Sequence, residues 1–222
     1  MKAIPDELEK AYAEALARGS ADAWALSRLI SFKKALYRRN LEDARALLPE
    51  DEPYSEELSQ FLEDLKEERF DPWLTAGPAF VRAEAWVRKG ALWAIEGERE
   101  KAREAFLKAL ELDSRHPRAL VNLGNLELEA GRVDEAIERY QKALKIDEEL
   151  ADAHHNLAAA YKKKGDIDRM VRHLKRAQRL TMYPPQESRG RRGGVAPIYT
   201  RFWFWFLLAA LAYFLLRRPG IG

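Results

Sequence analysis

The residues best suited to chemistry are two adjacent histidines, His154 and His155. Neighbouring residues on a helix point to different faces, so the two rings would not meet at one metal ion. No third ligand stands at a suitable spacing. We interpret one histidine as a residue at the edge of the core and the other as part of an exposed groove, and we expect no metal.

No pattern typical of an enzyme accompanies the histidines. The chain contains no G-x-S-x-G, no phosphate-binding loop and no dinucleotide fingerprint. It also contains no cysteine, which excludes disulfides, thiolate catalysis and cysteine metal sites. Carboxylate pairs are frequent, but any solvated helix face carries them. We therefore expect no catalytic residue, no cofactor and a protein that works by binding.

A repeat of 34 residues indicates the elements that would position binding residues. Gly97, Gly131 and Gly165 lie 34 residues apart. Each stands where a helix would end, because glycine accepts the left-handed conformation found there. The aligned blocks are residues 83–116, 117–150 and 151–184. A fixed period of this size predicts a stack of helical units.

Small and large residues recur at matching positions of the blocks. Small residues stand where two helices would cross closely, and large residues fill the space between layers. The small residues are Gly90, Ala102, Ala109, Gly124, Ala136, Ala143, Ala158 and Ala177. The large residues are Trp86, Trp93, Phe106, Tyr140 and Tyr161, and the blocks also carry Leu120, Leu123, Leu157 and Leu174. This pattern resembles the tetratricopeptide repeat, a helix–turn–helix unit.

The match has departures that bear on helix ends. Lys89 stands where the second block has Leu123, Glu127 replaces an expected aromatic residue, and Met170 replaces an expected alanine. An unrelated amphipathic helical bundle is the alternative, but three copies in register favour the repeat. The resemblance implies an all-α, right-handed helical solenoid over residues 83–184.

The resemblance also implies a binding groove, because the first helix of each repeat lines the concave face in this family. Family members often hold a ligand's main chain with asparagines at the positions of Asn125 and Asn156, since an amide both donates and accepts. The family's cationic clamp for a C-terminal carboxylate is not matched, because Val121 and Asp152 occupy two of its positions. The implied groove residues are Val87, Arg88, Ala91, Val121, Asn122, Asn125, His155, Asn156 and Ala159. The other interpretation is that the asparagines only cap or solvate their helices.

Residues 1–82 are expected to form a helical N-terminal region. An apolar stripe from Leu8 to Leu16 ends at Gly19, and further helical patterns follow up to the break at Gly77-Pro78. A solenoid needs such a cover, because its terminal face is otherwise apolar. Whether this region contains degenerate repeats stays open.

The residues after Pro184 change in character. Residues 185–197 carry arginines and glycines without periodicity, which indicates a flexible basic linker. Phe202 to Leu216 then contains no charge, and we predict a transmembrane helix over residues 198–218. The uncharged run is short for a span, so the arginines at its ends would extend their side chains toward the membrane surfaces. More arginines precede the span than follow it, which predicts a single-pass protein of the cell (inner) membrane with its repeats facing the cytoplasm.

Basic residues gather just before the predicted span. Residues 162–192 hold eleven lysines and arginines against three acidic residues. Such clusters are attracted to anionic lipid, at about 1 kcal/mol per residue. The residues expected to face lipid are Arg176, Arg179, Arg189, Arg191 and Arg192. The alternative is a nucleic-acid-binding helical protein that uses residues 162–192, with the apolar tail serving oligomerisation; nucleic acid is the less favoured partner.

The sequence thus predicts a membrane-tethered scaffold or adaptor that binds a protein or peptide. An accessory subunit or assembly factor of a larger membrane complex would carry the same features, and the sequence does not separate the two.

Overall fold

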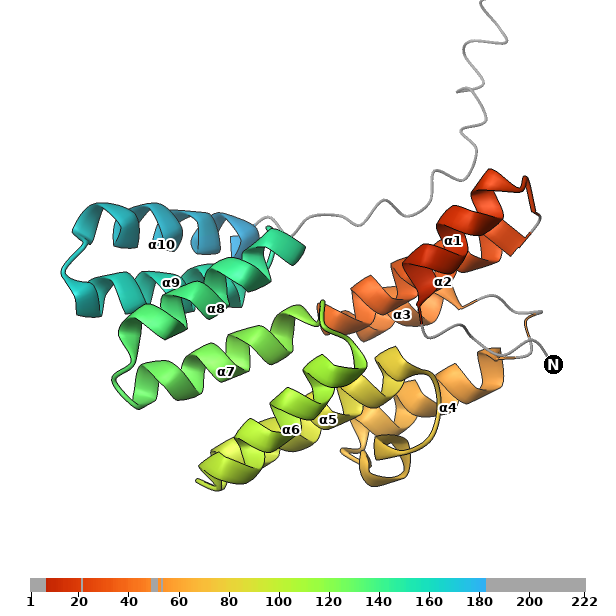
Figure 1. The fold of residues 1–222 in the computed structure, drawn as a ribbon, viewed down its shortest axis with the longest axis horizontal. Coiled ribbons are helices and arrows are strands. Elements are labelled where there is room, and N and C mark those ends of the chain that lie inside the picture. The colour runs from red at the N-terminus through yellow and green to blue at the C-terminus, as the bar shows by residue number, and fades with distance from the viewer. Residues whose placement is uncertain (1–6, 21, 49–51, 53, 183–222) are drawn as a thin grey trace, which may run out of the picture. The chain divides into compact units, whose positions relative to one another are not determined.

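The computed structural model describes residues 7–20, 22–48, 52 and 54–182, which are entirely helical or irregular (Figure 1). The N-terminal elements are α1 (Leu8–Ala17), α2 (Asp22–Tyr37), α3 (Leu41–Leu47), α4 (Ser55–Lys66) and the 3-10 helix η1 (Asp71–Leu74). The elements of the repeats are α5 (Ala79–Ile95), α6 (Arg99–Leu112), α7 (Pro117–Glu129), α8 (Val133–Ile146), α9 (Ala151–Lys164) and α10 (Ile167–Met182). None of these described helices is both long enough and apolar enough to cross a membrane. The predicted linker and span, residues 185–218, lie outside the described residues.

Helices α5 to α10 form three consecutive pairs, with α5 beside α6, α7 beside α8 and α9 beside α10 (Figure 1). The predicted turns at Gly97, Gly131 and Gly165 are confirmed, with φ of 84°, 80° and 79°. At each turn the next residue donates its N–H back to a carbonyl five residues earlier, as from Glu98 to Trp93 at 2.8 Å. The first of these helices begins at Ala79, four residues before the first predicted block.

Two glycines allow the paired helices to cross closely. A Cβ atom added at Gly124 would lie 2.6 Å from Cε1 of Tyr140, and one added at Gly90 would lie 2.7 Å from Cε1 of Phe106. Both rings are almost fully buried, so neither can move away freely. The small and aromatic residues of the repeat therefore form one packing unit.

The structure explains the departures from the repeat pattern. Glu127 is buried, and it forms ion pairs with Arg103 and Arg132 in place of an aromatic contact. The ammonium of Lys89 lies 2.9 Å from Oδ1 of Asp71 and over the ring of Trp93. Met170 packs against the apolar cluster of the second and third repeats. These substitutions leave the helix pairs intact.

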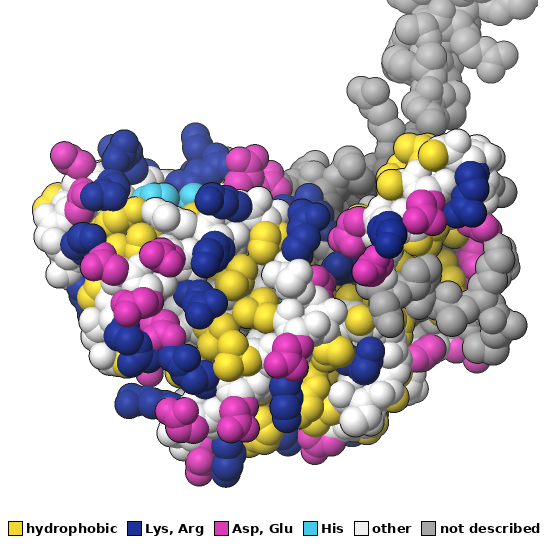
Figure 2. All heavy atoms as spheres, in the orientation of Figure 1, with side chains coloured by type: hydrophobic (Ala, Val, Ile, Leu, Met, Phe, Trp, Pro, Cys, Tyr) yellow, Lys and Arg dark blue, Asp and Glu magenta, His cyan; other side chains and the backbone are white. Residues whose placement is uncertain are grey.

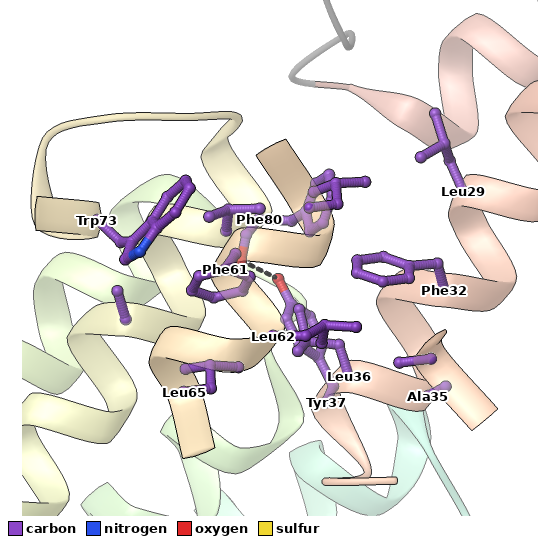
Figure 3. Packing of buried hydrophobic residues seen from close by; sticks show 14 of the residues in the cluster. Leu29, Phe32, Ala35, Leu36, Tyr37, Phe61, Leu62, Leu65, Trp73 and Phe80 are labelled. Atoms are coloured by element: carbon purple, nitrogen blue, oxygen red, sulfur yellow. Dashed lines mark hydrogen bonds between the residues drawn. The ribbon is translucent and has the colours of Figure 1, made fainter. Parts of the chain in front are cut away.

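The N-terminal helices share an apolar core with the first repeat (Figure 3). Phe32 of α2 meets Phe80 of α5 edge to face, with ring centroids 6.2 Å apart. Phe61 of α4 packs in the same way on Trp73, at 5.1 Å. Burial of each such side chain stabilises the fold by about 1.5–3 kcal/mol, so this core fixes α2 and α4 against α5.

The C-terminal end of α2 also reaches the later repeats. The guanidinium of Arg38 donates from Nε to Oδ2 of Asp147 at 2.7 Å and from Nη2 to Oδ1 at 2.6 Å, and its Nη2 also reaches Glu149 at 2.7 Å. Arg118 of α7 donates to the main-chain carbonyls of Tyr37, at 2.5 Å, and Arg38, at 3.3 Å. The turn that follows α2 is therefore held on the start of α7 and on the turn between α8 and α9.

A buried polar network lies beneath this turn. The ring of Tyr37 stacks on His116, with centroids 3.8 Å apart. Nδ1 of His116 accepts the main-chain N–H of Ala119, so its hydrogen is on Nε2, which lies 3.1 Å from Oε2 of Glu84. On its other side Glu84 accepts from Nε of Arg88 at 2.5 Å. His116 thus caps α7 and binds a buried carboxylate of α5.

The charge of Glu84 is stabilised by these neighbours. Burial acts to raise the pKa of Glu84, but the charge of Arg88 and the hydrogen bond from His116 outweigh it, and the pKa falls to about 2. The carboxylate is therefore ionised at neutral pH although it is fully buried.

Replacing Gly124 by alanine should lower the free energy of unfolding by about 1–3 kcal/mol, because the new methyl group collides with the ring of Tyr140. Denaturant titration measures this loss. Gly131→Ala is the control, because its surroundings are open and it carries only the cost of a positive φ, about 1 kcal/mol. Unchanged stability of Gly124→Ala would show that the helices do not cross closely here.

Replacing Glu84 by glutamine should destabilise the protein near neutral pH by about 3–5 kcal/mol, because Arg88 loses its buried counter-charge. The lowered pKa of Glu84 stabilises the fold above its ordinary value of 4.5, and this contribution disappears as the pH falls toward about 2. The difference in the free energy of unfolding between the unchanged protein and the variant should therefore decrease as the pH is lowered from 6 to 3. Denaturant titrations at each pH measure this difference. A difference in the free energy of unfolding that is the same at every pH would contradict the ionised state of Glu84.

Candidate functional site

The candidate site is one face of α5, α7 and α9, which we call the groove face. Because the repeat is 34 residues long, each row on this face takes one residue from each of the three helices. The rows are Arg88, Asn122 and Asn156; Ala91, Asn125 and Ala159; and Glu84, Arg118 and Asp152. The groove face is therefore polar and built on regular helices, which hold their side chains more firmly than loops do.

Two of the predicted asparagines are joined by a hydrogen bond. Oδ1 of Asn125 accepts from Nδ2 of Asn156 at 2.8 Å and from the hydroxyl of Tyr140 at 2.8 Å. Burial raises the pKa of Tyr140 and the nearby Glu129 raises it further, so the phenol keeps its hydrogen. Both asparagines lie inside their helices and not at the ends. Their amides are thus oriented from below by a side chain of the core.

Two buried donors on this face have no acceptor. Nη2 of Arg88 and Nδ2 of Asn122 are shielded from solvent, and the described part of the chain offers neither a hydrogen-bond partner. They occupy equivalent positions of neighbouring repeats. An unsatisfied buried donor costs about 1–3 kcal/mol, so these two groups are suited to an acceptor that a ligand brings. Two other buried atoms without a partner, Oη of Tyr54 and Nε of Arg82, are not in these rows.

The other predicted groove residues differ in exposure. Val87 and Val121 lie in apolar clusters, with 0% and 4% of their surfaces exposed. A ligand on the groove face cannot reach them, so we leave both out of the site. Ala91 is half-buried, and His155 and Ala159 are exposed.

Three residues of the groove face, Glu84, Arg118 and Asp152, were not among the predicted groove residues. Arg118 donates from Nη1 to Oδ2 of Asp152 at 2.8 Å, and this pair bridges two successive repeats. The 34-residue spacing from Glu84 through Arg118 to Asp152 was the signal that could have identified them. The contacts of Arg118 with the turn after α2 had no signal in the sequence.

The two adjacent histidines take different environments. His154 is buried, donates from Nε2 to the carbonyl of Glu148 at 3.0 Å and meets Nδ1 of His173 at 3.0 Å. Desolvation lowers the pKa of both His154 and His173, so both are neutral near pH 7. His155 is exposed. No group of three or more potential metal ligands occurs among the described residues.

A basic hollow of ≈ 550 Å³ lies beside this histidine pair. It is lined by Glu148, His154, Arg169, Arg172, His173, Arg176 and Arg179. Figure 2 shows histidine surface at the upper left of the molecule with lysine and arginine side chains around it. Two of the five arginines expected to face lipid, Arg176 and Arg179, line this hollow; Arg189, Arg191 and Arg192 lie outside the described residues.

Comparison with known families identifies the repeats. Models described as tetratricopeptide repeat match residues 83–116, 105–138 and 151–181, and a model described as TPR repeat matches residues 124–165. Residues 83–181 therefore contain tetratricopeptide repeats, and the described residues form an all-helical solenoid of this type, as the sequence predicted. No curated protein matches the chain.

Two solved structures are similar to part of this chain. The structure described as "Crystal structure of MamA" is 21% identical, covers 77% of this chain and 94% of its own, and has a TM-score of 0.43. The structure described as "Crystal structure of MamA protein" is also 21% identical, covers 81% of this chain and 97% of its own, and has a TM-score of 0.41.

Proposed function

We propose that this protein is a membrane-tethered scaffold whose groove face binds an extended peptide segment of a protein partner. The observation that supports the proposal most is the row of Arg88, Asn122 and Asn156, in which two buried donors have no acceptor among the described residues. Tetratricopeptide repeats and the interaction surfaces that solenoids provide are consistent with binding to a protein.

The chemistry of the row suits the main chain of a peptide. An extended peptide presents a carbonyl and an N–H at each residue, and both need partners when they leave water. Asparagine amides can satisfy either group. Oδ1 of Asn125 already accepts two hydrogen bonds. The Nδ2 group of Asn125 and the side-chain carbonyl of Asn156 are therefore the groups that face a ligand. Main-chain hydrogen bonds of this kind give affinity, while neighbouring side chains give specificity.

We propose binding and not catalysis for this face. Its charged groups are committed to holding one another, as Glu84 is by Arg88 and Arg118 is by Asp152. Catalysis by a nucleophile would need a hydroxyl or thiol beside a base, and the rows of the groove face contain neither.

We propose further that residues 198–218 tether the scaffold to the cell (inner) membrane, with the repeats in the cytoplasm. The support is in the sequence, where an uncharged run follows a basic segment. Arg172, Arg176 and Arg179 of α10 have no carboxylate partner among the described residues and would favour anionic lipid. A scaffold placed in this way could serve as an accessory subunit or an assembly factor of a membrane complex.

Replacing Asn125 and Asn156 together by alanine should weaken peptide binding by ~10-fold or more, because at least two hydrogen bonds of about 1 kcal/mol each are lost. The probe is a synthetic peptide selected from a random library on the immobilised full chain in mild detergent, and fluorescence anisotropy gives Kd. Tyr140→Phe is the matched control. Like the double variant, it removes the hydrogen bond between the hydroxyl of Tyr140 and Oδ1 of Asn125, but it leaves both asparagines on the groove face. Equal affinities of the double variant and the unchanged protein would refute the groove.

Removing the tail should release the protein from membranes. We expect the full chain to sediment with membranes and to resist a carbonate wash, and a chain that ends at Pro197 to stay in the supernatant. If the full chain is soluble without detergent, or if carbonate extracts it, residues 198–218 do not span. Tight binding of the full chain to RNA or DNA that falls steeply with salt would instead favour the nucleic-acid alternative.

A further inference from the structure

We infer that the N-terminal helices supply a cation to the groove face, where Arg39 joins Arg88 to bind a carboxylate of the peptide. This inference rests on the proposed function, since the peptide brings the carboxylate. It adds that the ligand carries a negative charge and that the turn after α2 binds this charge. The cation comes from outside the repeats, which explains why the repeat positions alone predicted no such site.

The position of Arg39 follows from its neighbours in the chain. The guanidinium of Arg118 donates to the carbonyls of Tyr37 and Arg38, so the turn after α2 lies against the first part of α7. Tyr37 stacks on His116, which binds Glu84, the partner of Arg88. Arg39 is the next residue of this turn. It is therefore placed beside both the α5 and the α7 members of the groove face.

The side chain of Arg39 has no ion-pair or hydrogen-bond partner within the described residues. Its pKa is lowered, first by desolvation and then by the positive charges of Arg118 and Arg88, although Glu84 and Asp152 oppose this effect. A cation held among like charges is stabilised when an anion arrives.

The acidic groups nearby are already engaged. Glu84 is bound by Arg88 and His116, and Asp152 by Arg118. In contrast Nη2 of Arg88 is buried without an acceptor. A carboxylate has two oxygens that can accept from two guanidinium groups at once, and such charge-assisted bonds are about twice as strong as neutral ones. The donors of Arg39 and Arg88 therefore match a carboxylate better than a neutral carbonyl.

The backbone of Arg39 has a left-handed conformation. Its φ is +60°, and Asn40 donates its N–H to the carbonyl of Ala35 at 3.0 Å, so α2 ends by the same turn as the first helix of each repeat. The repeats have glycine at this position, because a side chain there costs about 1 kcal/mol. Arginine is thus less stable than glycine at position 39. Strain of this kind is often found where the side chain has a function.

Glu68 provides a matched control for this strain. Its φ is +58°, and it ends α4 in the same way, with Arg69 donating to the carbonyl of Asp64 at 2.8 Å. It is not part of the turn that contacts Arg118. Strain alone therefore does not identify a binding residue, and the contacts of the turn after α2 distinguish Arg39 from Glu68.

The test compares Arg39→Gly, Arg39→Gln and Glu68→Gly. A random peptide library, fused through its C-terminal end so that no free carboxyl terminus is displayed, is selected on each full chain in mild detergent. With the unchanged protein and with Glu68→Gly we expect aspartate or glutamate to be enriched at one peptide position. With both Arg39 variants this enrichment should disappear, and the affinity of the selected peptide should fall ~10-fold. The melting temperature of Arg39→Gly should stay equal or rise, as should that of Glu68→Gly.

The outcomes separate the two proposals. Two results would overturn the role of Arg39 without contradicting the groove proposal. In one, the unchanged protein selects peptides that have no acidic position. In the other, both Arg39 variants select peptides with the same acidic position as the unchanged protein does. Failure to select any peptide would overturn both. Because the library displays no free carboxyl terminus, an enriched acidic position assigns the carboxylate to a side chain of the peptide.

Discussion

The structure depends on one buried charge, the carboxylate of Glu84. Removing an ion from water costs several kcal/mol, and only well-placed partners offset this cost. Arg88 provides one partner from the same helix, and His116 provides the other from the start of α7. Because His116 also caps α7 and stacks on Tyr37, the same network fixes α2, α5 and α7 to one another.

This network gives the N-terminal helices two roles. They cover the apolar end of the first repeat, through the core that Phe32 and Phe80 share. They also extend along the repeats, because Arg38 binds Asp147 and Glu149 in the turn between α8 and α9. The face that carries the unsatisfied donors is therefore bordered by a turn from outside the repeats. In our proposal, the scaffold binds its ligand with both parts of the chain.

The architecture was predictable where the cause is local. The glycine turns, and the small residues opposite Phe106 and Tyr140, are properties of a 34-residue unit and can be read directly from its repetition. The burial of Val87 and Val121 was not predictable in this way, because it depends on the angle at which neighbouring helices cross. The pair of Arg38 with Asp147 joins residues 109 positions apart, and no pattern in the sequence marks it. The positive φ of Arg39 was equally hidden, since arginine carries no turn signal.

The central claim is that the turn after α2 and the groove face bind one ligand together. Hydrogen exchange of the full chain, measured by mass spectrometry with and without a selected peptide, tests this most directly. We predict that the peptide slows exchange both in residues 38–41 and in α7 and α9. Slower exchange in α7 and α9 alone would contradict a role for the N-terminal helices, and unchanged exchange in all of these segments would contradict binding at this face.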